Sequence, residues 1–456
     1  MKVNLKTLGC RLNEAESETW AQQFQMAGHS IVRLPEQADL IVLNTCAVTT
    51  EAGRKSRQMI RRLHRGNPAA KLVVSGCYAT LEEEQAAAEL GVDLIIRNQD
   101  KHRLVDLVKE HVITDAMPAA AVEPGRAALF QQGRQRAFIK VQDGCRYRCT
   151  FCIVTVARGE ERSRPVDRII EQINLLHGQG IQEVILTGVH LGGYGAEFGI
   201  DLYRLIREIL DRTGIPRIRL GSLEPWDIPD SFFKLFSDSR MMPHLHLPLQ
   251  SASDSVLRRM ARRCKTEGFI RLADRARSEV DDINLTTDII VGFPGETEHE
   301  WRESLANIEK IGFGQIHIFT YSAREGTKAA SLANQVPRSE KKQRSQVLHQ
   351  LSESMKLNTF RRYLGRQFPV LWEARPDNSV SGEEPVGGYT PNFLRVAVPA
   401  APGLENSIRL VRLTGILDSG TGLQGQFEVR TEVEQRKDQP FRNTHSECMD
   451  GLIERC

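Results

Sequence analysis

Three cysteines in the middle of the chain have the spacing of an iron–sulfur loop. Cys145, Cys149 and Cys152 form a C-x3-C-x2-C triplet in the loop after a predicted strand. Thiolates at this spacing can hold one corner of a [4Fe–4S] cluster and leave one iron without a protein ligand. Such an iron can bind a chelating amino acid, such as the methionyl part of S-adenosylmethionine (SAM). The alternatives are a zinc site with a distant fourth ligand and incidental cysteines. A four-cysteine electron-transfer cluster is disfavoured, because no fourth cysteine lies nearby in the sequence.

Three other cysteines are far apart in the sequence but share one position relative to predicted strands. Cys10, Cys46 and Cys77 each follow directly on an apolar, strand-like segment. In a parallel α/β sheet, the loops after the strands open on one edge, where ligands bind. We therefore expect these thiols to converge and to hold a second cluster, also with an exchangeable iron. The alternative is that they are ordinary buried cysteines near strands.

The other three of the nine cysteines are Cys264, in a basic helical segment, and Cys448 and Cys456, near the C-terminus. We interpret them as free thiols, with a metal site at Cys448 and Cys456 as the alternative. The chain has no long apolar run and no apolar leader at its N-terminus, which predicts a cytoplasmic protein without a membrane partner. Cysteines stay reduced in that compartment, so their number favours metal binding or catalysis over disulfides.

The elements that must position these cysteines divide into several domains, as expected for 456 residues. Strand-like and helix-like segments alternate over 1–112, which predicts an α/β domain with a doubly wound parallel sheet. Residues 113–136 carry Pro and Gly without a sustained period and are predicted to be a linker. Six more strand–helix units and a charged exit helix over 137–364 predict an incomplete (β/α)6 TIM-like barrel. Short strands over 365–432 predict a small β-barrel, and 433–456 a polar tail.

The predicted barrel places glycines and polar side chains at the C-terminal ends of its strands, where barrels of this type have their active sites. Glycines let the backbone approach a ligand closely, and polar groups can hold the ammonium, carboxylate and ribose of SAM. Each residue alone could equally be ordinary turn chemistry. The candidate SAM-binding residues are Thr187, Gly188, Ser222, Glu224, Gln250, Asp288, Gly292, Pro294 and Gly295.

The predicted C-terminal barrel contains aromatic residues beside Asn and Arg. Tyr389, Asn392, Phe393 and Arg395 could stack on unpaired bases and contact phosphate, which predicts RNA binding. The alternative is that Tyr389 and Phe393 belong to the core. The net charge of +3 does not indicate a nucleic acid by itself, but four separate arginine-rich clusters favour a polyanionic partner.

These motifs together resemble the radical SAM methylthiotransferase family over about residues 1–432. The resemblance rests on the triplet, on the three N-terminal cysteine motifs and on a segment similar to a TRAM domain, an RNA-binding β-barrel. It implies two [4Fe–4S] clusters, SAM, a tRNA anticodon stem–loop, an electron donor such as a flavodoxin or ferredoxin, and a sulfur source. The motifs are LGCRLN, NTCAVT, SGCYA and GGYTPNFLRVAVP.

Within this family, TGVHLGGYG and RIRLGSLEPWD are most similar to the branch that acts on threonylcarbamoyladenosine beside the tRNA anticodon. The resemblance implies that hydrogen on carbon 2 of the adenine is replaced by a methylthio group, with a second SAM as methyl donor. Related branches act on isopentenyladenosine in tRNA or on an aspartate of a ribosomal protein. The alternative from another class is a non-catalytic iron–sulfur protein that binds RNA.

Overall fold

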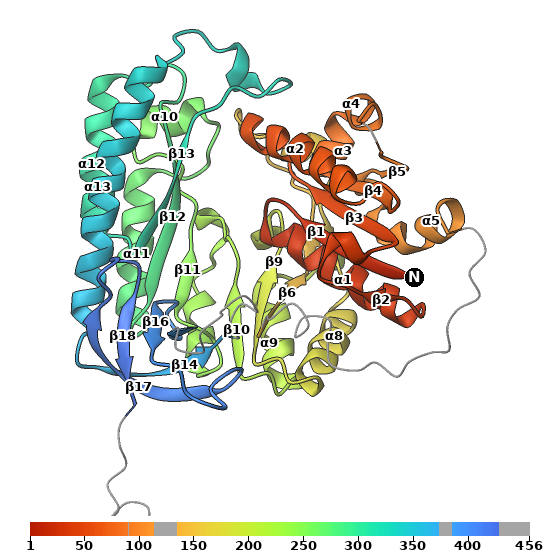
Figure 1. Ribbon diagram of the computed structural model, residues 1–456. Coiled ribbons are helices and arrows are strands. Elements are labelled where there is room, and N and C mark those ends of the chain that lie inside the picture. The colour runs from red at the N-terminus through yellow and green to blue at the C-terminus, as the bar shows by residue number, and fades with distance from the viewer. Residues whose placement is uncertain (90, 114–134, 374–384, 428–456) are drawn as a thin grey trace, which may run out of the picture.

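The computed structural model describes residues 1–89, 91–113, 135–373 and 385–427. The predicted linker, apart from its ends, and the predicted polar tail with Cys448 and Cys456 lie outside the described residues. Figure 1 shows an N-terminal domain beside a larger barrel-like domain, with a small C-terminal barrel packed against one end of the latter. In the described part of the chain, no helix is both long and apolar enough to cross a bilayer.

The N-terminal domain is built on a five-stranded parallel sheet, which confirms the predicted fold. Separate apolar cores fill its two faces, one under α2 and one under α1 and α5. The strands, in the order β2-β1-β3-β4-β5, are β1 (Lys2–Thr7), β2 (Ser30–Ile31), β3 (Leu40–Thr45), β4 (Lys71–Gly76) and β5 (Leu94–Ile96). The helices are α1 (Arg11–Met26), α2 (Thr50–Gly66), α3 (Cys77–Leu81), α4 (Glu83–Ala87) and α5 (Leu104–His111).

The central domain is an open barrel of six strands, as predicted. Two parallel three-stranded sheets meet through the isolated bridges Ile218↔Met241 and Ser222↔His246. The strands are β6 (Arg136–Lys140), β9 (Glu183–Thr187), β10 (Arg217–Leu220), β11 (His244–His246), β12 (Asn284–Val291) and β13 (Gln315–Thr320). The main helices are α7 (Val154–Arg158), α8 (Val166–Gly178), α9 (Leu202–Arg212), α10 (Asp254–Arg259), α11 (Thr266–Glu279) and α12 (Glu298–Ile311).

Side chains alternate along these strands between the helix layer and the barrel interior. On β6, Ala137 and Ile139 are buried in the main apolar core under the helices, so Phe138 faces the interior. Helix α1 covers the outer edge of β6, where the Glu18 carboxylate accepts a hydrogen bond from the Phe138 backbone N–H at 3.1 Å. The N-terminal domain therefore closes the side of the barrel next to β6 (Figure 1).

The exit helix α13 (Arg338–Tyr363) leads to a closed five-stranded barrel, as predicted. This small barrel lies at the N-terminal ends of the central strands, where Arg217 Nη1 donates to the Tyr389 carbonyl at 3.1 Å and Asn284 Nδ2 to the Asn392 carbonyl at 2.9 Å. Its strands, in the order β14-β15-β16-β18-β17, are β14 (Gln367–Trp372), β15 (Val386–Tyr389), β16 (Arg395–Val398), β17 (Ile408–Ile416) and β18 (Leu423–Gln426).

Candidate active site

The three N-terminal cysteines lie together at one edge of the sheet. Cys10, Cys46 and Cys77 follow β1, β3 and β4, which are neighbours in the sheet. Cys46 and Cys77 are buried and Cys10 is exposed. Burial, with smaller contributions from the nearby Cys77 and Cys10 thiols, raises the pKa of Cys46 to about 11. Three converging thiols with one exposed edge fit a cluster that keeps an open iron.

Two glycines make this convergence possible. Gly9 and Gly76, each one residue before a cysteine, have φ angles of +102° and +107°. A Cβ on Gly9 would lie 2.8 Å from Cys46 Sγ, and a Cβ on Gly76 would lie 2.3 Å from the Thr45 carbonyl oxygen. Both positions therefore require glycine for conformation and for space.

The second triplet lies in the loop between β6 and α7, at the C-terminal end of β6. Burial raises the pKa of Cys145 to about 12, and the neighbouring Cys152 and Cys149 thiols contribute to the rise. The Val154 N–H donates to Cys152 Sγ at 3.4 Å. Gly144, before Cys145, has φ +73°, and a Cβ there would lie 1.9 Å from the Glu160 carbonyl oxygen. The donor set and the tight loop fit a three-thiolate cluster.

A cation borders this triplet. Arg262, after α10, lies beside the Cys149 thiol; burial raises the pKa of Cys149, and the guanidinium opposes this rise. Arg262 Nη2 also donates to Glu224 at 2.7 Å, and its guanidinium lies 4.4 Å from the Trp226 ring centroid. The site thus includes a positive charge that favours thiolate over thiol.

A buried histidine is linked to the cysteine loop through two carboxylates. His190 Nδ1 lies 2.5 Å from Glu161 and its Nε2 lies 2.5 Å from Asp227. Asp227 also accepts from the Tyr147 hydroxyl at 3.1 Å, and Tyr147 belongs to the cysteine loop. Burial lowers the pKa of His190, but the hydrogen bonds to the two carboxylates outweigh it, so the net shift is upward.

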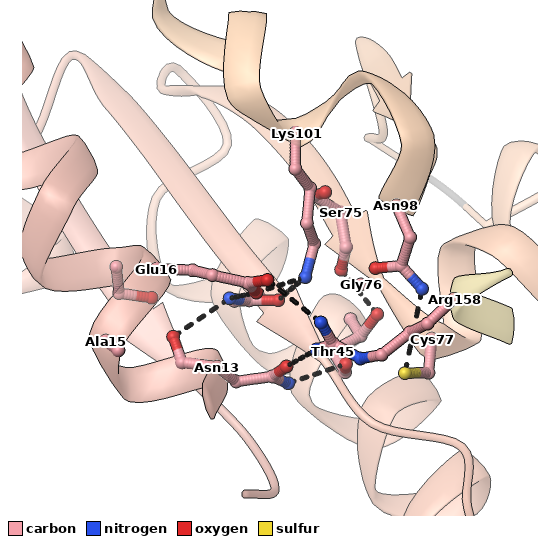
Figure 2. Close-up of polar contacts among 12 residues, drawn as sticks. Asn13, Ala15, Glu16, Thr45, Ser75, Gly76, Cys77, Asn98, Lys101 and Arg158 are labelled. Carbon is pink, nitrogen blue, oxygen red and sulfur yellow. Dashed lines mark hydrogen bonds and ion pairs between the residues drawn. The ribbon is translucent and has the colours of Figure 1, made fainter. Parts of the chain in front are cut away.

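A buried ionic network between the domains lies next to Cys77 of the N-terminal triplet (Figure 2). Arg158, at the end of α7, has its guanidinium 3.0 Å from Glu16 of α1, and its Nη2 donates to Asn13 Oδ1 at 2.7 Å. Burial would raise the pKa of Glu16, but Arg158, Lys101 and Lys140 lower it well below its usual range. With Asp143 as the second acid, the network carries one more positive than negative charge.

Members of this network touch the N-terminal cysteines. Asn13 Nδ2 donates to the carbonyls of Leu8 and Thr45, which hold the loops before Cys10 and Cys46. Asn98 Nδ2 donates to Cys77 Sγ at 3.7 Å and to the Ala157 carbonyl of α7 at 2.7 Å. The same short helix that follows the central triplet therefore fixes the surroundings of the N-terminal one.

Several predicted SAM-binding residues lie around the central triplet. Glu224 lies beside Cys149 and Cys152, and Gly188 packs on Gln142, where a Cβ would lie 2.8 Å from Gln142 Oε1. Gln142 in turn donates to the Gly144 carbonyl before Cys145. Thr187 ends β9, and its carbonyl accepts from the Val141 N–H at 2.9 Å. For these residues, contact with SAM stays a prediction.

The other predicted SAM-binding residues lie across the barrel. Ser222 bridges to His246, and Asp288 accepts hydrogen bonds from His246 and His317, so the three ionisable groups lie within 4.8 Å of one another. Gln250 has φ +73° and pairs with Ile289. The turn with Gly292, Pro294 and Gly295 packs near α13, where a Cβ on Gly292 would lie 2.4 Å from Lys341 Cγ. Packing explains Gly292, and a φ angle of +74° explains Gly295, so for all these residues contact with SAM stays a prediction.

The four predicted RNA-binding residues have different environments in the structure. Asn392 has no exposed surface and donates to the Asp282 carbonyl at 3.2 Å, so the prediction that it contacts RNA is wrong. Tyr389 and Phe393 stack with ring centroids 4.8 Å apart. They lie over Arg136 at the floor of the central barrel, which is the end where its strands begin. This contact holds the two barrels together. Arg395 is exposed, and its contact with RNA stays a prediction.

Sequence reasoning missed the residues that connect the two triplets. Glu16 and Arg158 lie on helices and read as ordinary surface charges, although Glu16 falls on a helix face where most residues are buried. A charged residue on the apolar face of a predicted helix is the signal in the sequence that could have identified such residues. Cys264, interpreted as a free thiol, is buried, with Sγ 3.4 Å from the Lys265 carbonyl oxygen.

Two family models match the chain. Residues 2–97 match the uncharacterized protein family UPF0004, and residues 139–308 match the radical SAM superfamily. Among solved structures, the radical SAM methyltransferase TsrM from Kitasatospora setae superposes with a TM-score of 0.53 at 15% identity, covering 70% of this chain and 72% of that one. At this identity the likeness concerns the fold alone.

Curated relatives cover most of the chain. The threonylcarbamoyladenosine tRNA methylthiotransferase MtaB of Thermotoga maritima is 37% identical over 81% of this chain and 86% of its own. The protein of the same name from Bacillus subtilis is 34% identical over 93% and 96%. The tRNA-2-methylthio-N(6)-dimethylallyladenosine synthase of Syntrophotalea carbinolica is 33% identical over 90% and 96%.

Proposed function

The chain belongs to the radical SAM methylthiotransferase family that modifies tRNA, and from this membership we propose that it acts on threonylcarbamoyladenosine next to the anticodon. A relative at 37% identity and three more at 34% carry that activity in their names. The observation that carries the proposal is the buried contact of Arg158 with Glu16 and Asn13, which ties the two cysteine triplets to one site.

The cofactor set follows from the cysteines. A radical SAM domain uses SAM and one [4Fe–4S] cluster, for which Cys145, Cys149 and Cys152 are the ligands we propose. We propose a second cluster on Cys10, Cys46 and Cys77. When bound, these groups supply the one-electron reduction of SAM and the sulfur that is inserted.

The protein's own residues position these groups and exclude water. Arg158 and Lys101, both paired with Glu16, lie beside the N-terminal thiols, and Arg262 lies beside Cys149. Charges fixed in a buried site act more strongly than in water, because little solvent screens them. We further propose a cytoplasmic setting, a flavodoxin or ferredoxin as electron donor, and a separate sulfur source.

One assay tests the proposal. The protein is reconstituted anaerobically with iron and sulfide and is given SAM, a reductant and tRNA bearing threonylcarbamoyladenosine, and the nucleosides are analysed by mass spectrometry. We expect cleavage of SAM and a 2-methylthio product. Intact SAM would point to a non-catalytic iron–sulfur protein.

The second candidate is dimethylallyladenosine in tRNA, because relatives of that name reach 33–35% identity. The same assay with tRNA bearing that nucleoside separates the two. Modification of this tRNA alone would assign the chain to the other branch.

A further inference from the structure

The floor of the central barrel carries more positive than negative charge. Four guanidinium groups gather there with two carboxylates, on strands β6, β9 and β10, on α1 and at the end of β14, and Glu14 of α1 is a third carboxylate near Arg11. Phe393 of the small barrel closes the floor, with Arg136 and Arg219 over its ring at 5.5 and 4.6 Å. The groups are Arg11, Arg136, Arg217, Arg219, Glu183 and Glu373.

Three of these arginines donate to acceptors within the protein, which explains why they lie there. Arg136 pairs with Glu373. Arg217 donates to the carbonyls of Tyr389 and Pro369, and Arg219 pairs with Glu183 at 2.8 Å. Each of the three therefore has an acceptor, and Arg219 also donates to the Pro391 carbonyl of the small barrel at 2.9 Å.

Arg11 differs from the other three. It begins α1, directly after Cys10, and its guanidinium carbon lies 6.0 Å from the Phe138 ring centroid and 5.8 Å from that of Phe393. Within the described part of the chain, no hydrogen bond or ion pair engages its guanidinium, which is half-buried. Burial lowers the pKa of Arg11, and the neighbouring Arg136 and Arg219 lower it further. An anion bound here would supply acceptors and offset the excess charge.

We propose that Arg11 is a specificity-determining residue that binds the carboxylate of the threonylcarbamoyl substituent, an inference that rests on the proposed function. This substituent is a threonine joined through a carbonyl to the adenine amino group, so it carries a free carboxylate. Guanidinium binds a carboxylate through two parallel hydrogen bonds, and the Phe138 and Phe393 rings beside it can steer its plane. The position of Arg11 next to Cys10 places the bound nucleoside beside the N-terminal thiols.

The same residue would discriminate against an apolar substituent. A dimethylallyl group offers no acceptor, so its binding would leave the guanidinium of Arg11 desolvated and unpaired. Sites that hydrogen-bond a polar group reject analogues without it more strongly than apolar pockets reject added groups. Arg11 thereby separates the two nucleosides on which relatives of this chain act.

Synthetic anticodon stem–loops test the inference in the reconstituted holoprotein. One bears threonylcarbamoyladenosine, one its methyl ester and one dimethylallyladenosine, and binding is measured by fluorescence anisotropy without SAM or reductant. We expect the free acid to bind about 10- to 150-fold more tightly than the ester, the range for a hydrogen bond to a charged group. Arg11→Gln should remove this preference, and Arg11→Lys should retain part of it.

Arg271→Gln is the matched control, because Arg271 lies exposed on α11 and pairs with Glu267 of the same helix. It should keep the full preference. Iron content is measured for every variant because Arg11 adjoins Cys10, and Arg11→Lys decides the test if the glutamine variant loses iron. An unchanged acid-to-ester ratio in Arg11→Lys and Arg11→Gln would overturn the role of Arg11 while the proposed substrate stands. Modification of the dimethylallyl stem–loop alone by the wild type would overturn both.

Discussion

Arg158 Nη2 lies 2.7 Å from Asn13 Oδ1, and this contact joins the N-terminal domain to the central barrel next to both cysteine triplets. Arg158 is six residues beyond Cys152, and Asn13 is three residues beyond Cys10. The relative position of the triplets is thus set by short, buried stretches of chain. A reaction that needs two cofactors on one nucleoside requires such fixed geometry.

Loss of the Arg158 guanidinium should separate the domains. Arg158→Gln leaves the buried Glu16 carboxylate with Lys101 and Lys140 as its cations, and losing the hydrogen bonds of the guanidinium to charged groups costs about 1.5–3 kcal/mol. We expect a lower melting temperature and faster proteolysis between the domains. Arg271→Gln removes an exposed pair and should change stability by less than about 1 kcal/mol. Equal melting temperatures for the two variants would show that the network does not hold the interface.

The glycine before Cys77 should be indispensable for the N-terminal site. Gly76→Ala adds a Cβ that would lie 2.3 Å from the Thr45 carbonyl oxygen, so the loop that carries Cys77 must shift. We expect the variant to keep about half of the iron after reconstitution, because the central triplet is untouched. Gly199→Ala is the matched control, since its φ is +68° but no atom lies within 4 Å of the added carbon. It should keep its full iron content, and equal loss in both variants would assign the effect to backbone strain.

The arrangement of strands and the convergence of the cysteines could be predicted from the sequence. Apolar runs such as Leu40–Leu43 are buried on both faces of the sheet, as their sequence pattern predicts. The three strands β1, β3 and β4 are each followed by a cysteine within three residues. Parallel order then brings Cys10, Cys46 and Cys77 to one edge without further information.

The contacts between domains could not be predicted in the same way. Glu16, Arg158 and Arg11 are charged helix residues, and only the packing of α1 against β6 buries or half-buries them. Asn392 and Phe393 read as an exposed RNA-binding loop, because nothing local indicates that the small barrel turns this loop toward the central one. Contacts between segments far apart in the sequence depend on how the folded domains pack, which no local sequence pattern indicates.

Alanine substitutions should separate the roles of the two triplets. Cys149→Ala should abolish SAM cleavage and keep about half of the iron, whereas Cys46→Ala should spare SAM cleavage and stop sulfur insertion. Deoxyadenosine and methylthio-nucleoside are quantified from the same reactions. Loss of all iron in Cys149→Ala would mean that the sites are interdependent, and methylthiolation by Cys46→Ala would disprove the N-terminal cluster.

The Arg262 guanidinium should raise the reduction potential at the central triplet. It lies beside Cys149, and a positive charge beside a cluster stabilises the reduced form, which is more negative. Arg262→Gln should therefore shift the potential downward, as measured by redox titration followed by electron paramagnetic resonance. Arg258→Gln changes an arginine of α10 and serves as the control. An upward shift in Arg262→Gln would contradict this role.

His190 should make the stability of the central barrel depend on pH. Burial lowers its pKa, but hydrogen bonds to Asp227 and Glu161 raise it more, so the folded protein binds the imidazole proton more tightly than the unfolded chain. The resulting stabilisation is fully present below the unfolded pKa of about 6.5 and is lost as pH rises through the higher folded value. Wild type should therefore exceed His190→Gln in melting temperature by the largest margin near pH 6, and this margin should shrink toward pH 9.

The size and sign of this margin distinguish a charged from a neutral imidazole. Removing the cation leaves Glu161 with the Arg146 N–H and Asp227 with the Tyr147 hydroxyl as their hydrogen-bond partners, and the lost hydrogen bonds cost about 3 kcal/mol, which lowers the melting temperature by several degrees. His299→Gln, at an exposed position on α12, should match the wild type at every pH. A margin that grew with pH would mean that His190 is neutral in the folded protein. The contacts that link His190 through Asp227 to Tyr147 of the cysteine loop would then be hydrogen bonds of a neutral imidazole.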